Sequence, residues 1–386
     1  MLLRRTISMR NIYIKAAVCA MLCLAITANI TACGKKPEEL KPDETTTTAQ
    51  TTTVTTAQTE KATTTTTTST AKKKKKKAKE KKENYNPLTG LFDVANKSKG
   101  RRPVAVMVNN IVDALPQYGI SKADIIFEIP AEGGITRLMA VYGDESDIPD
   151  VCSIRSGRYY FAFFAQSFDA VYMHWGIDKK LALPLIEELG IDHIDDSYYG
   201  TLFERDPDRS YMSMEHTGYL IGENVMSTID ASGIRSNTKD GYNSFFKFYD
   251  EFTKPKGDKC TQAIVNFSDW YVSQFDYDKK TNTYKKLHNG EKHMDSKADK
   301  QLEFKNLLLL ESEDMHVIRE DNGLISVDWK GGNGYLVTAG KVQPITWSKE
   351  DEFAKLIIKD ENGKKITLNT GKTYIGVTKK GTISLN

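Results

Sequence analysis

The stretch between residues 34 and 83 consists mainly of threonine and lysine, and it limits which part of the chain can fold. It includes unbroken runs of threonine at residues 63–68 and of lysine at residues 72–77, with almost no large apolar side chain. Such a segment cannot bury enough apolar surface to offset the conformational entropy that folding would cost. We therefore predict a disordered spacer over residues 33–85 and a folded body over residues 86–386.

The N-terminus has the order of a secretory signal peptide. An apolar stretch at residues 16–26 is too short to span a bilayer as a stable helix. Small residues then lead to Cys33, and Ile30-Thr31-Ala32-Cys33 resembles the bacterial lipobox, whose cysteine receives diacylglycerol after the preceding peptide is removed. The alternative is an ordinary signal peptide with an incidental cysteine. Four basic residues precede the apolar stretch: Arg4, Arg5, Arg10 and Lys15. We predict a lipoprotein signal peptide over residues 1–32 and lipidation at Cys33.

Charge is divided unevenly along the chain. Residues 1–83 carry 17 lysines and arginines against 7 aspartates and glutamates, a net charge of +10. The whole chain carries 54 against 51, so residues 84–386 carry 37 against 44, a net charge of −7. An acidic body argues against nucleic acid as a partner. The basic run is either a solvated spacer or a segment that lies on anionic lipid or cell-wall polymer, where each lysine contributes about 1 kcal/mol.

Two cysteines remain in the body, because Cys19 and Cys23 belong to the signal peptide and Cys33 is the anchor. Cys152 and Cys260 could form one disulfide or stay as buried thiols. A body of this size buries a sufficient core without disulfides. We therefore expect free thiols.

The body divides by pattern into residues 86–255 and 256–386. In the first part, short apolar runs predict strands at residues 103–108, 124–129, 135–142 and 168–175. Aromatic or amphipathic stretches predict helices at residues 157–167, 179–189 and 213–227. Strands mixed with helices indicate a layered α/β domain.

The second part is richer in hairpin signals. Three Asn-Gly pairs, at residues 322–323, 333–334 and 362–363, lie between short β-rich runs, which is the strongest local signal for a hairpin. The runs lie at residues 315–319, 324–329, 335–338, 356–358, 366–368 and 374–377. We predict a mostly antiparallel β domain here, as a curled sheet or small barrel, and an α+β fold for the whole body.

Several enzyme signatures are missing from the sequence. It contains no His-Glu-x-x-His, no P-loop, no Gly-x-Ser-x-Gly and no Cys-x-x-Cys. Its six histidines are scattered, without the spacing of a metal site. We therefore predict no metal and no cofactor.

A polar constellation in the first domain is the candidate ligand site. Residues 153–158 place two serines and two arginines just before the predicted aromatic helix, where backbone N–H groups and guanidinium groups would suit a carboxylate or phosphate. The candidate ligand-binding residues are Arg137, Arg155, Ser156, Arg158, His174 and His216.

The same residues also have a structural interpretation, in which the arginines pair with carboxylates such as Glu128 or Glu132 and the histidines bond to the backbone. A ligand site predicts at least two guanidinium groups without a carboxylate partner. Scaffolding predicts a carboxylate partner for each arginine.

The order of motifs resembles the YerB family of predicted bacterial lipoproteins, over residues 86–386. The matching stretches are residues 86–90, 102–110, 123–128, 134–137, 153–158, 168–172, 205–206, 216, 292–295 and 346–347. The resemblance implies a lipobox, a low-complexity spacer and two domains of unknown function, with no established reaction. Family members often continue the fourth strand as His-x-Gly-Gly-Ser. Here the sequence is His174-Trp175-Gly176-Ile177-Asp178, so a glycine loop that would hold a ligand is interrupted.

These observations favour a non-catalytic lipoprotein, anchored through a diacylglyceryl cysteine on the extracytoplasmic face of the cell membrane. Its partner would be a cell-wall polymer, another envelope ligand or an envelope protein. The alternative is an envelope hydrolase or transferase in which His174 or His216 acts as general base and the three arginines stabilise a developing anion. A deep cleft that converges on the arginines would favour the enzyme, and a shallow surface would favour the binding protein.

Substituting the predicted anchor, as Cys33→Ala or Cys33→Ser, should release the protein from the membrane without unfolding the body, because the acyl chains are lost. Membrane fractionation and a thermal melt check this expectation. A variant that stays fully membrane-bound would contradict it and point to the lysine run instead.

Overall fold

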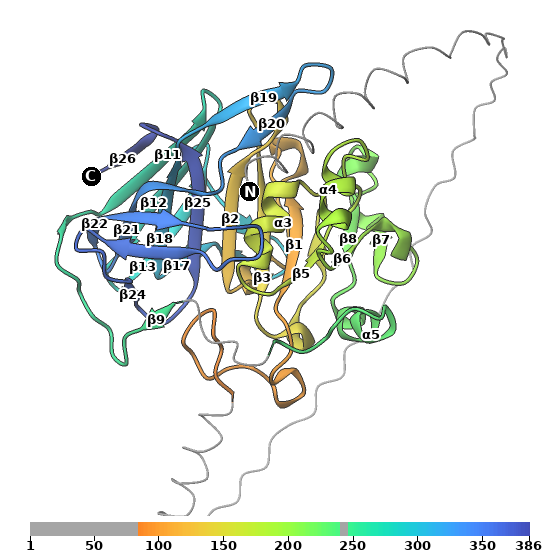
Figure 1. Cartoon of the computed structure of the whole chain (residues 1–386), viewed down its shortest axis with the longest axis horizontal. Coiled ribbons are helices and arrows are strands. Elements are labelled where there is room, and N and C mark those ends of the chain that lie inside the picture. Colours follow the sequence, from red (N-terminus) through yellow and green to blue (C-terminus); the bar gives the residue numbers. More distant parts are fainter. Residues whose placement is uncertain (1–83, 240–245) are drawn as a thin grey trace, which may run out of the picture. The chain divides into compact units, whose positions relative to one another are not determined.

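The structure, a computed structural model, describes residues 84–239 and 246–386 (Figure 1). The predicted signal peptide, Cys33 and nearly all of the predicted spacer lie outside these residues. Within the described part, no helix combines the length and apolar character needed to cross a membrane.

One large sheet runs through the body and contains strands from both halves of the chain (Figure 1). Its order is β10-β22-β21-β18-β25-β2-β3-β1-β5-β6, and β23 pairs with β22. The strands are β1 (Val104–Asn109), β2 (Ile125–Pro130), β3 (Thr136–Tyr142), β5 (Val171–Met173), β6 (His193–Ile194), β10 (Asp258–Lys259), β18 (Asn306–Ser312), β21 (Gly331–Thr338), β22 (Lys341–Ser348), β23 (Ile357–Asp360) and β25 (Thr373–Lys379). Near the C-terminus, β25 lies between β2 and β18 and is parallel to both.

Helix α3 (Tyr159–Gln166) covers one face of this sheet. All eight of its residues are buried, as expected for a helix that is apolar on every side. The ring of Phe164 lies 5.4 Å from that of Phe127 on β2 and 6.2 Å from that of Trp347 on β22. The helix therefore packs on strands from both halves. Two further helices are α4 (Ala182–Glu188) and α5 (Val225–Ala231).

A second, antiparallel sheet packs on the opposite face. Its order is β14-β13-β12-β11-β26, and β17 pairs with β13. The strands are β11 (Gln262–Ser268), β12 (Tyr271–Asp278), β13 (Thr283–His288), β14 (Glu291–Lys292), β17 (Glu303–Phe304) and β26 (Ile383–Leu385). The rings of Phe275 on β12 and Tyr374 on β25 lie 4.5 Å apart. Because side chains alternate along a strand, Tyr374 faces this sheet while its neighbour Ile375 belongs to the core beneath α3.

Smaller ladders complete the body. They are β4 (Val151–Cys152) with β8 (Gly218–Leu220) and β7 (Phe203–Arg205), β15 (Met294–Asp295) with β16 (Lys300–Gln301), β19 (Met315–Arg319) with β20 (Leu324–Val327), and β9 (Lys247–Phe248) with β24 (Thr367–Leu368). The α+β class is confirmed, with large sheets, few helices and mostly antiparallel strands in the C-terminal half. Cys152 and Cys260 are free and buried, as expected.

Two sequence predictions are wrong. The Asn-Gly pair at residues 333–334 lies inside β21, where a Cβ on Gly334 would come within 2.4 Å of the Leu309 carbonyl oxygen, so close strand approach explains the glycine. Residues 213–227 do not form one helix, because β8 pairs with β4 and β7 in the middle of this stretch. By contrast, Asn289-Gly290 joins β13 to β14 in a two-residue turn with both φ angles positive.

A buried ion pair connects the two sheets. Glu128 on β2 and Lys286 on β13 are fully buried, and their charged atoms, Oε2 and Nζ, lie 3.3 Å apart. The carboxylate also accepts hydrogen bonds from four side chains: Asn110, Thr136, Ser273 and Tyr374. Burial alone would raise the pKa of Glu128, but the nearby positive charge and these donors hold it below its usual value.

The lysine is satisfied in the same way. Its ammonium group donates to Ser273 Oγ at 2.8 Å and to His293 Nδ1 at 3.0 Å. The other ring nitrogen of His293 lies 2.8 Å from Gln117 Oε1, which fixes the tautomer as neutral with the proton on Nε2. The network therefore continues from one sheet to the loop after β1.

Replacing one member of the pair, as Lys286→Met, should lower the free energy of unfolding by about 3–5 kcal/mol, because it leaves a buried carboxylate without its cation. Urea unfolding measures this loss. The control is Lys285→Met, whose partly exposed ammonium pairs with Asp278, and it should leave stability almost unchanged because exposed ion pairs contribute little. Equal losses in the two variants would contradict the structural role of the buried pair.

Candidate functional site

The six predicted ligand-binding residues lie together at one edge of the central sheet. Arg137, the second residue of β3, lies opposite Asn109, the last residue of β1, and His174 follows the end of β5, which is parallel to β1. The segment 153–158 runs along the same edge, where the Arg155 backbone bonds to the Met107 carbonyl and to the Trp175 N–H. Ligands commonly bind at the carboxyl ends of parallel strands. We call Arg137, Arg155 and Arg158 the arginine cluster.

Arg158 is fully satisfied by protein groups. Its Nε and Nη2 donate to the two carboxylate oxygens of Glu132, and its Nη1 donates to the carbonyl of Gly157 at 2.7 Å and of Ser156 at 3.3 Å. Burial alone would lower the pKa of Arg158, but the bidentate contact with Glu132 raises it. This geometry is that of a structural ion pair.

Arg137 is buried but poorly satisfied. Within residues 84–239 and 246–386, Nη1 is the one donor of Arg137 that makes a hydrogen bond, to the Ser156 carbonyl, and its Nε is buried without a partner there. Its nearest carboxylate oxygen belongs to Glu132, 3.8 Å from Nη2 and already occupied by Arg158. Burial, together with the repulsion of Arg158, lowers the pKa of Arg137 to about 9. The guanidinium group therefore retains unused donors.

Arg155 lies nearer the surface. Its Nη2 donates to Glu215 Oε2 at 2.7 Å, while its Nε is buried without a partner. The Arg155 side chain is 24% exposed and that of Glu215 is 51% exposed. The hydrogen bond from Arg155 is the main reason that the pKa of Glu215 is lowered. The pair is therefore accessible to solvent, and it forms the outer part of the cluster.

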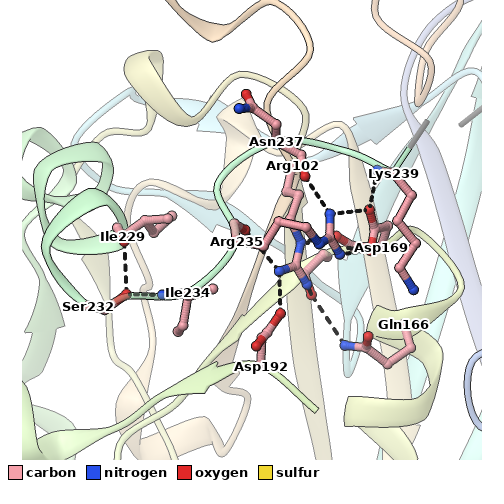
Figure 2. A network of polar contacts seen from close by, with 11 residues as sticks. Arg102, Gln166, Asp169, Asp192, Ile229, Ser232, Ile234, Arg235, Asn237 and Lys239 are labelled. Carbon is pink, nitrogen blue, oxygen red and sulfur yellow. Dashed lines mark hydrogen bonds and ion pairs between the residues drawn. The ribbon is translucent and has the colours of Figure 1, made fainter. Parts of the chain in front are cut away.

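A fourth arginine in the same half shows what a purely structural guanidinium group looks like (Figure 2). Arg102 is 1% exposed and donates to the carbonyls of Asp169, Ala170 and Arg235 and to the Asp192 carboxylate. The Asp169 carboxylate also accepts hydrogen bonds from both terminal nitrogens of Arg235. The network therefore connects the segment after α5 to the sheet. All three nitrogens of Arg102 are used, as are those of Arg158.

The sequence analysis expected at least two arginines without a carboxylate partner for a ligand site and a partner for each arginine for a scaffold, and the second pattern is found. Each guanidinium group has a carboxylate oxygen within 4 Å, from Glu132 or Glu215. Glu128 is not among them, because it pairs with Lys286 on the other face of the sheet. Three cations nevertheless share two carboxylates, which leaves a local charge of +1.

The histidines are held inside the protein. His174 is fully buried, with Nδ1 2.8 Å from the Gly176 carbonyl and Nε2 3.2 Å from His193 Nδ1. The pKa of His174 is lowered to about 4, mainly because the ring is buried. His216 accepts a hydrogen bond from Asn109 at Nδ1, and its Nε2 lies 3.8 Å from Glu215. Burial also lowers the pKa of His216.

Sequence reasoning did not single out two features of this edge. Asn109, which positions His216, lies in the family-like stretch 102–110, but nothing in that stretch indicates its contact with a histidine. The three arginines also differ in how many of their guanidinium nitrogens donate hydrogen bonds. This difference depends on contacts between distant segments, so the local sequence does not indicate it. Among the described residues, no group of three or more His, Cys, Asp or Glu side chains has the arrangement of a metal site.

Comparisons with known proteins agree with the sequence resemblance. Residues 88–235 and 263–375 match the N-terminal and C-terminal domains of a family described as "Protein of unknown function (DUF3048)". "Putative lipoprotein YerB" of Bacillus subtilis (strain 168) is 30% identical over 305 residues, which cover 75% of this chain and 85% of that protein. The crystal structure of the YerB protein from Bacillus subtilis superposes with a TM-score of 0.68 at 27% identity, covering 78% of this chain and 99% of that one. The chain therefore belongs to the YerB-like family of two-domain proteins, for which no function is established.

Proposed function

We propose that this protein is a lipid-anchored binding protein on the extracytoplasmic face of the membrane, and that it holds an anionic component of the cell envelope. The ligand would be a carboxylate- or phosphate-bearing wall polymer, or an acidic segment of an envelope protein. Arg137 and Arg155 are the proposed binding groups, with Ser156, His174 and His216 around them.

The observation that carries the proposal is the incomplete satisfaction of these two arginines. In the described part of the chain, each guanidinium group makes one hydrogen bond and has a buried Nε without a partner, whereas all three nitrogens of Arg102 and of Arg158 donate hydrogen bonds. An unused buried donor is unfavourable unless another acceptor completes it. A carboxylate or phosphate would supply such acceptors and would balance the excess positive charge of the cluster.

Glu215 occupies the position beside Arg155 that a ligand anion would take. It is half-exposed and acts as an internal counter-ion for Arg155. Because exposed ion pairs contribute only about 0–1 kcal/mol, a ligand anion can displace this carboxylate at little cost. Arg158 and Glu132 are less exposed and bidentate, and would keep their contact during binding.

The membrane anchor rests on a different observation. The sequence Ile30-Thr31-Ala32-Cys33 has the lipobox order, and the Bacillus relative is named as a lipoprotein. A diacylglyceryl group on Cys33 would tether the body through the Thr/Lys spacer, which is long enough to reach into the surrounding wall.

The alternative, a hydrolase or transferase, has less support. A general base needs a free nitrogen within reach of substrate. Both ring nitrogens of the fully buried His174 are already in contact with protein groups. His216 is 4% exposed and bonded to Asn109.

The binding test uses three probes: a phosphodiester wall polymer, a carboxylate-bearing peptidoglycan fragment and a neutral N-acetylglucosamine oligomer. At least one anionic probe should bind more tightly than the neutral one. Arg155→Gln should weaken that binding by about 1–3 kcal/mol, the contribution of a charge-assisted hydrogen bond. Calorimetric titration measures both effects. Lys359→Gln, which removes an exposed charge on β23, is the control. Equal affinity in the two variants would refute the proposed site.

A stability test separates the structural arginine from the proposed binding arginine. Arg158→Ala should cost about 3–5 kcal/mol, because it leaves Glu132 and two backbone carbonyls without their donors. Arg155→Ala should cost less than about 1 kcal/mol, because its pair with Glu215 is exposed. Thermal or urea unfolding measures the difference. A large loss for Arg155→Ala would assign that arginine to the scaffold.

A further inference from the structure

A cavity of about 660 Å³ lies away from the arginine cluster, where the two halves of the chain meet. One wall comes from the short helical turn η3 (Ile120–Lys122), which precedes β2. The other walls come from the start of β13, from residues 299–305 around β16 and β17, and from residues 371–372 just before β25. Together with Leu91, five separate segments of the chain therefore form one hollow, which we call the lysine cleft.

The lysine cleft has apolar side chains among its lining. Ile120, Ala123, Leu302 and Phe304 each have 2% or less of their surface exposed. Their packing is shared with the core that joins the two sheets, so this part of the lining is held in place. Leu91, which is 39% exposed, adds a further apolar side chain. An apolar lining of this kind favours a ligand that has an apolar part.

The charged side chains of the cleft carry an excess of positive charge. Four lysines face two carboxylates, those of Asp299 and Glu303. The lysines are Lys285, Lys300, Lys305 and Lys372. Glu303 already accepts a hydrogen bond from the Thr283 hydroxyl, so one of the two carboxylates is partly occupied. Lys285 also pairs with Asp278 outside the lining, so the remaining excess of one positive charge would attract an anion.

Two of the lysines are incompletely compensated. Lys300 is exposed, and its ammonium group makes no hydrogen bond or ion pair with any described residue. Lys372 is half-buried, and among the described residues its ammonium group donates only to the Ser121 carbonyl, although Asp124 lies near enough to favour its charge. Lys285 and Lys305 are engaged, with Asp278 and with the Thr281 carbonyl. Lys300 and Lys372 are therefore the groups that a ligand anion would contact.

A neighbouring cavity of about 630 Å³ shares Ser121, Lys300 and Lys372 with the lysine cleft. This second cavity is also lined by four acidic residues: Asp147, Asp150, Glu223 and Asp295. Its four lysines are thus balanced by four carboxylates, and it offers no net charge to an anion. The charge pattern therefore favours an anion in the first cavity over the second, with its charged end at Lys300 and Lys372 on the border that the two cavities share.

We propose that the lysine cleft is a second binding site, independent of the arginine cluster, for a small organic anion: a carboxylate or phosphate that carries an apolar group. Lys300 and Lys372 hold the charged end. The apolar group lies against the exposed side chain of Leu91, above the buried side chains of Ile120, Leu302 and Phe304. A volume of about 660 Å³ is in the range of sites that enclose such small molecules.

The test titrates the full chain with four probes: phenyl phosphate, benzoate, inorganic phosphate and phenol. Binding is followed by calorimetry and by chemical-shift changes at residues 300–305. At least one of the two aromatic anions should bind more tightly than both inorganic phosphate and phenol, because only these probes use the charged end and the apolar wall together. The stronger of the two identifies the natural ligand as a phosphate or a carboxylate.

Lys300→Gln should weaken the preferred probe about tenfold, the loss expected for one charge-assisted contact. Because Lys300 is exposed and unpaired, this variant should fold normally, whereas Lys372→Gln removes a half-buried group and is the second variant. The control, Lys359→Gln, lies outside the cleft. Binding that is equal for phenyl phosphate and inorganic phosphate, unchanged in Lys300→Gln, or absent at millimolar probe would overturn the proposal. Arg155→Gln should leave this binding unchanged, so the two sites are tested separately.

Discussion

The arrangement of the whole body depends on a single buried ion pair between its two sheets. Glu128 occupies the middle of β2, and Lys286 reaches it from β13 with no access to solvent. Desolvating two charges is costly, and only a full set of hydrogen bonds makes the arrangement tolerable. That requirement fixes the positions of Ser273, Tyr374 and Asn110 around the carboxylate. A shifted register of either sheet would leave a charge unpaired, so the pair selects one packing of the two layers.

Local pattern was sufficient for much of the fold. The valine-rich run that became β1 and the aromatic run that became α3 were both predicted, because a buried strand and a buried helix differ in length and composition. Long-range pairing left no such signal. Nothing in residues 373–379 indicates that they enter the central sheet beside β2, 248 residues away at the paired positions Ile125 and Thr373. The mistaken helix at residues 213–227 has the same origin, since the partners of β8 come from elsewhere in the chain.

The candidate site was predictable in location but not in chemistry. The arginines and histidines were expected to gather, and they do so because the strand ends that carry them meet at one edge. The directions of the Glu132 and Glu215 side chains decide which arginine has a structural role. Sequence spacing does not indicate these directions. The lysine cleft was missed for a simpler reason. Its lysines belong to three separate segments, each of which alone resembles an ordinary solvated surface.

The position of β25 has a consequence for any shortened form of this protein. This strand is inserted between β2 and β18, and it makes parallel hydrogen bonds to both. A chain that ends before Thr373 would keep two facing strand edges separated by the width of one strand. Such a slot is a template for an incoming extended segment, as in donor-strand complementation. The two halves of this body are therefore not interchangeable modules, since the last long strand of one half completes the sheet of the other.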